Sequence, residues 1–596
     1  MAVLAVASEA IVVYVALELA PGITVRGFGA AFLTSLIVGI VSQGLYYAVG
    51  VDEQQAFLTE VLRRASRRPA PPPADGQTGV VFIQMDGVSL PLLEWALLAG
   101  NLPTLNRWIR DGTHVARGWT TRLPSTTPIS QAGILHGNTE NMPAFRWYEK
   151  DLGRLVVANH PPDAGLIETR LSDGRGLLAD GGVSISNLFS GDAPRALLTM
   201  SAIGRKQASG RPRDFVSFFA APYGFWRTLT RTVGEMVKER YQARRQVRHD
   251  VEPRVSRHGS YVALRGFTNV LQRDLNVVLV AEAMMQGAKS VYVDFLDYDE
   301  IAHHAGLGRP ESLAAVEGID RAIGSLEAVA RHAPRPYEFV VLSDHGQSQG
   351  ATFLQRYGER LEDLVRRLMG GADDVLAATG KDEEWGPVNA FLSSMRTGDD
   401  TVVRLGPSAD VDEELAGQGG ERPDLAVAGS GNLGLVWFPQ VPGRLPLEEL
   451  QERWPGLVAA LAEHPGVSFV MVDSRSRGPV VLGATGVRVL ASGEVEGVDP
   501  LAPFDAHVAD DLRRLSAFDN APDIYLNSQF DPESREVAAF EELVGCHGGT
   551  GGWQTKPMLV HPAGWVLDDD ELLGAEALHA QLVRWLEALG HREMLA

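Results

Sequence analysis

The stretch VDFLDYDEIAHHAG, from Val293 to Gly306, ends a short apolar run with four acidic side chains and two adjacent histidines. Asp299 and His303 are four positions apart, and residues at that spacing share one face of a helix. A carboxylate and an imidazole on one helical face can bind a single metal ion. Acids and histidines after a strand also occur in solvated loops, so the metal interpretation depends on a second acid–histidine set elsewhere.

Two further apolar runs end in residues of the same types. Asp86 follows the run at residues 80–83, and Asp344 and His345 follow the run at residues 340–342. Continuous apolar runs predict strands that are buried on both faces of a parallel sheet, and ligands bind beyond the carboxyl ends of such strands. A single Asp at a strand end is commonly a helix N-cap. Three strand ends with such residues together predict an active site.

The segment LPSTTPISQAGILHG supplies a candidate nucleophile. Thr127 precedes Pro128 at the predicted start of a helix, where free N–H groups and the helix dipole favour an alkoxide or a bound phosphate. A simple Ser/Thr helix cap is the alternative. Near the C-terminus, His547 lies among glycines in GCHGGTGG. Glycines let the backbone come close to a bound group, which makes His547 a candidate for the missing metal ligand.

These segments together resemble the type I phosphodiesterase/nucleotide pyrophosphatase branch of the alkaline phosphatase superfamily. The resemblance rests on MDG, PSTT, DEIAHHAG, SDHGQ and CHGG, which occur in the family's order and cover about residues 79–567. It implies an alkaline-phosphatase-like fold and a metal-dependent phosphoric-ester hydrolase, either a phosphodiesterase or a phosphatase. It also implies that Thr127 attacks phosphorus and becomes a phospho-threonine intermediate.

The resemblance further implies two zinc ions, with manganese as the alternative metal. The residues that would bind one zinc are Asp299, His303 and His547. The residues that would bind the other zinc, beside Thr127, are Asp86, Asp344 and His345. Asp297 and His304 would be neighbours of the site rather than ligands.

The stretch PAFRWYEK departs from the family pattern. Nucleotide pyrophosphatases place an Asn that contacts the phosphate after the nucleophile helix, whereas Phe145 or Arg146 occupies the matching place here. This departure puts nucleotide substrates in doubt. Arg146 is the predicted substrate-binding residue, because its charge could supply the missing positive field.

Three alternative functions are a sulfatase, a head-group transferase and a binding module without strong catalysis. A sulfatase needs a cysteine or serine in a C/S-x-P-x-R context, which TPISQ does not provide. A phosphoethanolamine-type head-group transferase stays open, because it too uses a threonine and a membrane anchor. The complete ligand set argues against a membrane-bound binding module with a weak site. We expect a phosphate-ester substrate whose leaving group is a nucleotide, a lipid head group, a cell-envelope polymer or a small phosphonate.

Strands that alternate with helical patterns predict an α/β fold with a mostly parallel sheet sandwiched by helices. Helices are expected at residues 91–100, 313–331, 354–369 and 445–464. The predicted division of the chain is a transmembrane helical hairpin at 1–50, a juxtamembrane helix and Pro-rich linker at 51–78, the catalytic core at 79–383, an inserted α+β unit at 384–540, and the returning core with its last ligand and a C-terminal helix at 541–596.

The first fifty residues are far more apolar than the rest. Two apolar runs, residues 3–20 and 28–49, are each about long enough to span a bilayer. We therefore expect a holin-like hairpin and a multi-pass protein of the cell membrane, with a buried soluble helix pair as the alternative. Arg63, Arg64, Arg67 and Arg68 follow the second run, and the positive-inside rule then favours a cytoplasmic catalytic domain.

The net charge of −21 argues against nucleic acid as a partner. The single cysteine, Cys546, excludes an intrachain disulfide and a Cys-rich zinc site. Residues 222–257 are a basic exception, in which arginines accompany apolar residues at helical spacing. This pattern predicts an ordinary amphipathic surface helix, an interfacial helix on anionic lipid, or a cap on an anionic substrate.

Overall fold

A computed structural model describes residues 57–59, 61–63, 76–203, 222–372, 374–378, 386–395, 422–569 and 571–592. The two apolar runs expected to form a transmembrane hairpin lie outside the described residues, so the hairpin stays a prediction. Within the ranges given above, no helix combines the length and the apolar character that crossing a membrane requires.

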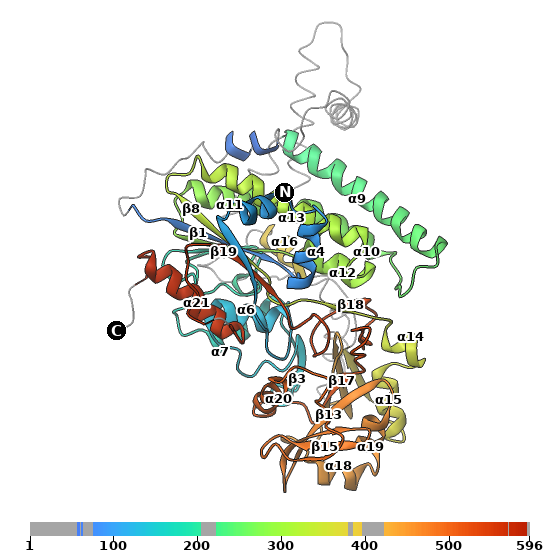
Figure 1. The fold of residues 1–596 in the computed structure, drawn as a ribbon. Coiled ribbons are helices and arrows are strands. Elements are labelled where there is room, and N and C mark those ends of the chain that lie inside the picture. Colours follow the sequence, from blue (N-terminus) through green and yellow to red (C-terminus); the bar gives the residue numbers. More distant parts are fainter. Residues whose placement is uncertain are drawn as a thin grey trace.

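The apolar runs that precede the acidic residues form adjacent strands of one sheet (Figure 1). In spatial order its strands are β2 (His114–Gly118), β19 (Met558–Pro562), β8 (Tyr337–Leu342), β1 (Gly79–Met85), β7 (Ser290–Phe295), β5 (Val183–Ile185) and β6 (Arg195–Leu197). The run from β8 to β6 is parallel, whereas β19 and β2 pair in antiparallel fashion at one edge. The predicted α/β fold is confirmed, and the carboxyl ends of β1, β7 and β8 meet at one edge.

Helices cover both faces of this sheet. Successive residues of β1 point to opposite faces and therefore pack against different helices. Val80 and Phe82 pack toward α6 (Thr127–His136), α7 (Pro161–Leu171) and α21 (Ala575–Ala588). Val81 and Ile83 pack toward α4 (Leu90–Leu98), α5 (Pro103–Arg110), α11 (Arg273–Met285), α12 (Asp297–Ala305) and α13 (Pro310–Ala330). Burial on both faces explains why the strand sequences are continuously apolar.

A second sheet lies below the first in Figure 1. Its strands in spatial order are β10 (Val375–Ala378), β11 (Leu425–Ser430), β12 (Leu433–Trp437), β17 (Ile524–Ser528), β13 (Val467–Ser474), β14 (Gly478–Gly483), β15 (Gly486–Val489) and β16 (Val495–Gly497). One face packs on α15 (Leu361–Leu368), α18 (Leu447–Arg453) and α19 (Leu457–Glu463). The other face joins the core beneath the first sheet together with α20 (Val508–Ser516). The second sheet begins before residue 384, where the insert was expected to start.

Two predicted helices are each broken into two. The helix expected over residues 445–464 divides into α18 and α19, since Pro455 disfavours a helical conformation at Trp454 and Gly456 adopts a positive φ of 88°. The helix expected over residues 354–369 divides into α14 (Phe353–Tyr357) and α15 at Gly358, whose φ is 76°. In both cases the apolar periodicity continued across the break and concealed it.

The basic segment forms α9 (Pro222–Arg248), which ends nine residues earlier than the basic pattern does. It lies along the upper right of Figure 1, against α10 (Ser260–Gly266) and a short π-helical segment η2 (Phe267–Gln272). The remaining elements are β3 (Arg146–Glu149), β4 (Arg154–Val157), the 3₁₀ turn η1 (Met200–Ala202), β9 (Ser348–Gln349), α16 (Gly386–Met395) and β18 (Gly545–Cys546).

Candidate active site

One group of candidate ligands is formed by the ends of two adjacent strands and is called the strand-tip cluster, Asp86, Asp344 and His345. Asp86 follows β1 and the other two residues follow β8, which pairs directly with β1. Each residue offers a ligand atom within 4.8 Å of the others, and all three side chains are buried. His345 Nε2 lies 3.2 Å from Asp344 Oδ2 and 3.5 Å from Asp86 Oδ1. The three groups can therefore bind one metal ion.

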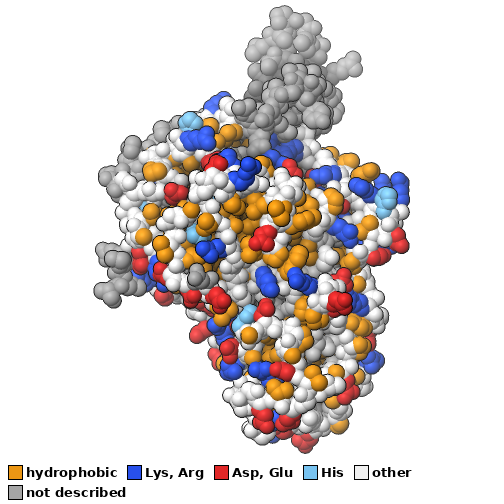
Figure 2. All heavy atoms as spheres, in the orientation of Figure 1, with side chains coloured by type: hydrophobic (Ala, Val, Ile, Leu, Met, Phe, Trp, Pro, Cys, Tyr) orange, Lys and Arg blue, Asp and Glu red, His pale blue; other side chains and the backbone are white. Residues whose placement is uncertain are grey.

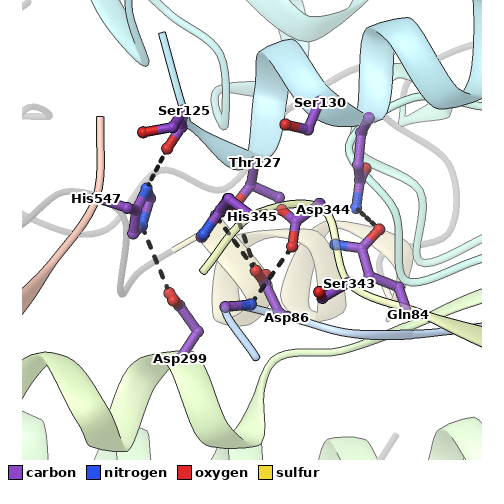
Figure 3. Close-up of polar contacts among 12 residues, drawn as sticks. Gln84, Asp86, Ser125, Thr127, Ser130, Asp299, Ser343, Asp344, His345 and His547 are labelled. Carbon is purple, nitrogen blue, oxygen red and sulfur yellow. Dashed lines mark hydrogen bonds and ion pairs between the residues drawn. The ribbon is translucent and has the colours of Figure 1, made fainter. Parts of the chain in front are cut away.

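Thr127 lies directly beside the strand-tip cluster (Figure 3). It is the first residue of α6, and Pro128 follows it in the first turn. Its Oγ1 is 3.0 Å from His345 Nε2 and 3.5 Å from Asp86 Oδ1. The hydroxyl thus meets two candidate ligands at the positive end of a helix, as its sequence position predicted.

The second group, Asp299, His303 and His547, is called the helix–loop cluster. Asp299 and His303 lie one turn apart on α12, and His303 Nε2 is 2.8 Å from Asp299 Oδ2. His547 comes from the loop after β18, and its Nε2 is 3.8 Å from the same oxygen. These ligand atoms also lie within 4.8 Å of one another. The two clusters adjoin, because the rings of His345 and His547 stack with centroids 3.8 Å apart.

Backbone carbonyls orient all three imidazoles. Nδ1 of His303 is 2.8 Å from the carbonyl of Gly545, and Nδ1 of His547 is 3.0 Å from that of Ser125. His345 makes the corresponding contact at 2.9 Å with Gly346. A carbonyl only accepts hydrogen bonds, so each Nδ1 must donate, and the lone pair of each neutral ring lies on Nε2. Metal-binding histidines are commonly held in this way by the ring nitrogen that does not bind the ion.

The electrostatics of the site also fit a bound cation. Burial and the charges of Asp344, Asp294 and Asp299 raise the pKa of Asp86 well above its usual range. Burial lowers the pKa of His345, which favours the neutral ring that a metal requires. Buried carboxylates this close together are unfavourable unless a positive charge compensates them. Carboxylate and imidazole ligands suit zinc, so the donor set fits the predicted metal.

A glycine lets the two clusters approach each other. Gly87 follows Asp86 and has a φ of 71°, and a Cβ at this position would lie 2.2 Å from Asp299 Oδ1. Any side chain at this position would therefore displace Asp299. The MDG motif thus combines a ligand with the glycine that makes room for a ligand of the other cluster.

Three residues discussed from the sequence lie outside both clusters. Arg146 does not line the cavity beside Thr127, because it is fully buried with its guanidinium 2.9 Å from Glu541 Oε1. Asp297 accepts a hydrogen bond of 2.8 Å from Arg273, and His304 packs against the Tyr261 ring. Glu541 also accepts a 2.6 Å bond from the backbone of Gly431, so Arg146 supports the β11–β12 turn.

Sequence reasoning missed a buried polar layer beneath the site. Asp294, the fifth residue of β7, accepts a 2.7 Å hydrogen bond from Gln131, whose amide also lies 3.3 Å from the Gln84 carbonyl oxygen. Burial and neighbouring carboxylates raise the pKa of Asp294 well above its usual range. The available signal was a polar residue inside an otherwise apolar strand, since buried polar groups require partners.

A cavity opens beside Thr127 and reaches Asp86 and Asp299. Its polar wall includes Asn159 and Asn187, neither of which was singled out from the sequence. Its apolar wall is formed by side chains from both layers of the core, among them Phe145, Leu188, Leu198, Met200, Phe267 and Phe391. The cavity therefore offers the candidate nucleophile and a mainly apolar surface to the same bound molecule.

Residues 80–470, well over half of the chain, match the sequence profile of the type I phosphodiesterase / nucleotide pyrophosphatase family. The chain belongs to this family. No curated protein matches this chain. Thr127 and five of the six residues of the two clusters lie within the matched range. His547 lies beyond its end.

Solved structures similar to this chain include those of the following three proteins. Phosphonoacetate hydrolase from Sinorhizobium meliloti is 14% identical, with 87% of this chain and 97% of that chain covered and a TM-score of 0.40. Murine ectonucleotide pyrophosphatase/phosphodiesterase 5 is 10% identical, with coverages of 87% and 96% and a TM-score of 0.41. Alkaline phosphatase PafA is 11% identical, with coverages of 83% and 91% and a TM-score of 0.40.

Family membership identifies the protein as a hydrolase that acts on phosphoric ester bonds. The described residues contain two groups that can bind metal ions, next to a buried threonine hydroxyl.

Proposed function

We propose that the protein is a two-metal phosphodiesterase in which Thr127 is the nucleophile and the metals are zinc. The observation that supports this most directly is the position of Thr127 Oγ1, 3.0 Å from His345 Nε2 at the start of α6. An ordinary helix cap would place a side-chain oxygen on a backbone N–H of its own helix. No such hydrogen bond is present at this helix start, and the hydroxyl is directed into the strand-tip cluster instead.

The strand-tip and helix–loop clusters would each bind one ion. Two bound divalent ions would lower the pKa of the attacking hydroxyl and stabilise the charge on the leaving oxygen. The chain itself would fix the direction of attack, because α6 holds Oγ1 and the free N–H groups at its start would favour an anionic phosphate there. The three Nδ1 bonds to backbone carbonyls keep the imidazoles from rotating.

The proposed reaction has two steps. Thr127 Oγ loses its proton and forms a bond to phosphorus, while the bond from phosphorus to the leaving oxygen breaks and that oxygen gains a proton from solvent. Water then attacks the phospho-threonine, the Oγ–phosphorus bond breaks, and the hydroxyl regains its proton. The second step releases the phosphorylated half of the substrate and restores Thr127.

The cavity favours a diester over a monoester. None of the described residues that line it is Lys or Arg, and the charged ones among them are all acidic, Asp86, Asp294, Asp299 and Glu300. A phosphodiester has one negative charge, whereas a monoester has up to two at neutral pH. A diester also has a second substituent that can occupy the apolar wall. We infer that the substrate is a phosphodiester with an apolar group, and a lipid-derived ester satisfies this description.

The decisive experiment replaces Thr127 in metal-replete enzyme and measures hydrolysis of bis-p-nitrophenyl phosphate and p-nitrophenyl phosphate. Thr127→Ala should reduce kcat by roughly two to four decades, the scale of losing a positioned catalytic group. Its metal content should equal that of the wild type, because all six ligands remain. Thr127→Ser should retain part of the activity.

Thr126→Ala is a matched control for this experiment. Thr126 is equally buried and adjacent, yet its side chain makes no cap hydrogen bond. The Thr126 variant should retain most of the activity. Hydrolysis of diesters by Thr127→Ala at the wild-type rate would show that water, rather than Thr127, attacks phosphorus.

We also propose that residues 1–50 anchor the enzyme in the cell membrane as a hairpin. The two apolar runs support this, and the arginines after the second run favour a cytoplasmic catalytic domain. Carbonate extraction should leave the protein in the membrane pellet. Complete release into the supernatant would contradict the anchor without affecting the catalytic proposal.

A further inference from the structure

Helix α9 has the reverse of the usual amphipathic arrangement. A surface helix normally buries an apolar stripe and exposes its charged residues. In α9, several charged residues face the protein, whereas valines and a tyrosine face outward. Such an arrangement requires an explanation, because exposed apolar side chains forgo the stabilisation that burial provides.

The inner side of α9 is held by buried ion pairs. Glu239 is fully buried and accepts two 2.7 Å hydrogen bonds from Arg257, and Arg265 also binds it. Arg265 further pairs with Glu235, one turn earlier on the helix. Closer to the start of the helix, the buried Arg227 pairs with Asp274. These paired charges fix which side of α9 faces inward, so the outer side is defined by the fold.

The outer side presents a regular apolar stripe. Val233, Val237 and Tyr241 follow one another at intervals of four and are 52%, 63% and 66% exposed. Residues at this spacing lie on one face of a helix. Val247, one turn and a half further on, is 63% exposed. Ten large hydrophobic side chains are exposed among the described residues, and four of them lie on this one helix.

Basic residues share this outward side with the apolar ones. Lys238, Arg240, Arg244, Arg245 and Arg248 are all exposed. None of the four arginines forms an ion pair with any described residue. The helix has seven Lys or Arg residues and two acidic ones, and both acids are the inward-facing Glu235 and Glu239. The outer side of α9 is therefore apolar and positive in a chain whose net charge is −21. Figure 2 shows hydrophobic and basic side chains together along the upper right, where Figure 1 places α9.

We propose that the outward face of α9 docks on the surface of an anionic lipid bilayer. An exposed helical face that carries both apolar and basic residues suits a helix that docks on an anionic membrane surface. Charge complementarity selects the occupant, because unpaired arginines attract anionic lipid while the acidic remainder of the chain is repelled by it. At about 1.5 Å per residue, the exposed stretch from Val233 to Arg248 offers a face roughly 24 Å long, which suits a flat surface better than a small ligand.

If α9 docks on the membrane, only α9 and the adjoining segment α10–η2 separate the membrane from the cavity beside Thr127. Gly266, at the end of α10, allows close packing, because a Cβ there would lie 3.1 Å from Met236 of α9. The next residues form η2, and Phe267 and Gln272 of η2 line the cavity beside Thr127. The proposal does not depend on the nucleophile or on the metals, because it concerns only the outer surface of α9.

The test places a fluorescent label on α9 in the full chain reconstituted into vesicles. Val237→Cys is labelled with an environment-sensitive dye, and quenching by a lipid-attached quencher is measured. Vesicles contain either phosphatidylcholine alone or a mixture with phosphatidylglycerol. Val566→Cys, which is 74% exposed and lies away from α9, is the matched label control. The buried native Cys546 stays unlabelled under folded conditions.

We expect the dye at position 237 to be quenched in the anionic vesicles, and the dye at position 566 to remain unquenched. Changing Arg244, Arg245 and Arg248 to Glu should lower the quenching at 237 to the level at 566. A matched triple reversal of exposed arginines elsewhere, at positions 110, 331 and 366, should leave the signal intact. High salt should weaken the response in the anionic vesicles.

Several outcomes would overturn the proposal. Equal quenching at both positions, or quenching that survives the reversal on α9, would mean that the chain is near the membrane without docking through α9. A dye at 237 that is shielded before vesicles are added would instead indicate a protein partner on this face. A response to a soluble polyanion without quenching by lipid would indicate binding of a polyanion.

Discussion

The two ligand clusters differ in what holds them together. The strand-tip cluster is formed by two neighbouring strands of one parallel sheet, so its geometry follows directly from the pairing of β1 with β8. The helix–loop cluster combines one turn of α12 with a glycine-rich loop. That loop is fixed by the second sheet, since Asn432 accepts a 3.0 Å bond from Gly549 and Asn527 a 2.9 Å bond from Thr550.

This difference shows that one half of the site depends on the pairing of two strands, and the other half depends on how a loop packs against the second sheet. Changes in the second sheet should therefore alter the helix–loop cluster and leave the strand-tip cluster intact. Because Thr127 contacts only the strand-tip cluster, the two halves should also differ in how much each contributes to catalysis.

The largest effect is expected from Asp344→Asn compared with His547→Gln. The first change removes a charge beside Thr127 and keeps the size of the side chain. It should lower kcat by about four decades. The second removes a ligand from the other cluster and should cost about two decades. Each variant should lose one of two metal equivalents in elemental analysis. Loss of both metals in both variants would show that the clusters form a single cooperative unit.

A smaller effect is expected from a glycine in the second sheet that touches no ligand side chain. Gly431 lies in the β11–β12 turn with a φ of 58°, and a Cβ there would lie 1.8 Å from the His547 carbonyl oxygen. Gly431→Ala should shift the loop and weaken binding of one metal by roughly tenfold to a hundredfold, the range found for residues that support a ligand. Metal titration with a competing chelator measures this.

Gly443→Ala is the control for this change. Gly443 has a similar φ of 69°, but a Cβ there would meet no atom within 4 Å. It therefore reproduces the backbone strain without the clash. If the two variants bind metal equally well, contact between the turn and His547 does not matter, and the contrast between the clusters is lost.

The smallest effect concerns the far end of α6, the helix that begins at Thr127. Burial alone would lower the pKa of His136, but Asp192 and Glu168 raise it to about 9. Because the folded pKa exceeds the unfolded value of about 6.5, the stabilisation is complete below pH 6.5 and is lost as the pH rises through 9. At about 1.4 kcal/mol per pKa unit, it is limited to about 3 kcal/mol.

The measurement is the thermal midpoint of the wild type and of His136→Gln across this pH range. The wild type should be the more stable protein at pH 6, and the difference should shrink between pH 7 and pH 10. A difference that stays constant with pH would mean that His136 is not charged in the folded protein. Metal content should not differ between the two proteins, because His136 contacts neither cluster.

The sequence predicts the ligand positions at the strand ends and on α12 better than it predicts what supports His547. The apolar runs before Asp86 and Asp344 are buried on both faces, and this double burial produces a pattern that can be read without the fold. The spacing of Asp299 and His303 is also readable, because residues four apart share one face of a helix. The support of His547 by Asn432 and Asn527 is not, because those contacts join residues about 115 and 20 positions away through the packing of the second sheet.

Two further features could not be read from the sequence pattern. The helix breaks at Gly358 and Pro455 lie within stretches whose apolar residues keep helical spacing. The apolar spacing predicts one continuous helix, whereas the Gly and the Pro favour a turn. Arg146 was expected at the substrate, but its partner Glu541 is almost 400 residues away in the chain. An arginine in a strand does not reveal whether it will pair with a distant buried acid or with a ligand.

The candidate ligands are synthesised in two stages, because of their order along the chain. Five of the six ligands precede residue 346, and His547 follows after about 200 further residues that include the second sheet. At roughly 5–20 residues per second, a ribosome needs on the order of 10–40 s to add them. The strand-tip cluster and Thr127 are therefore synthesised well before the helix–loop cluster can close. The nascent chain stays without a complete site until the second sheet has been made.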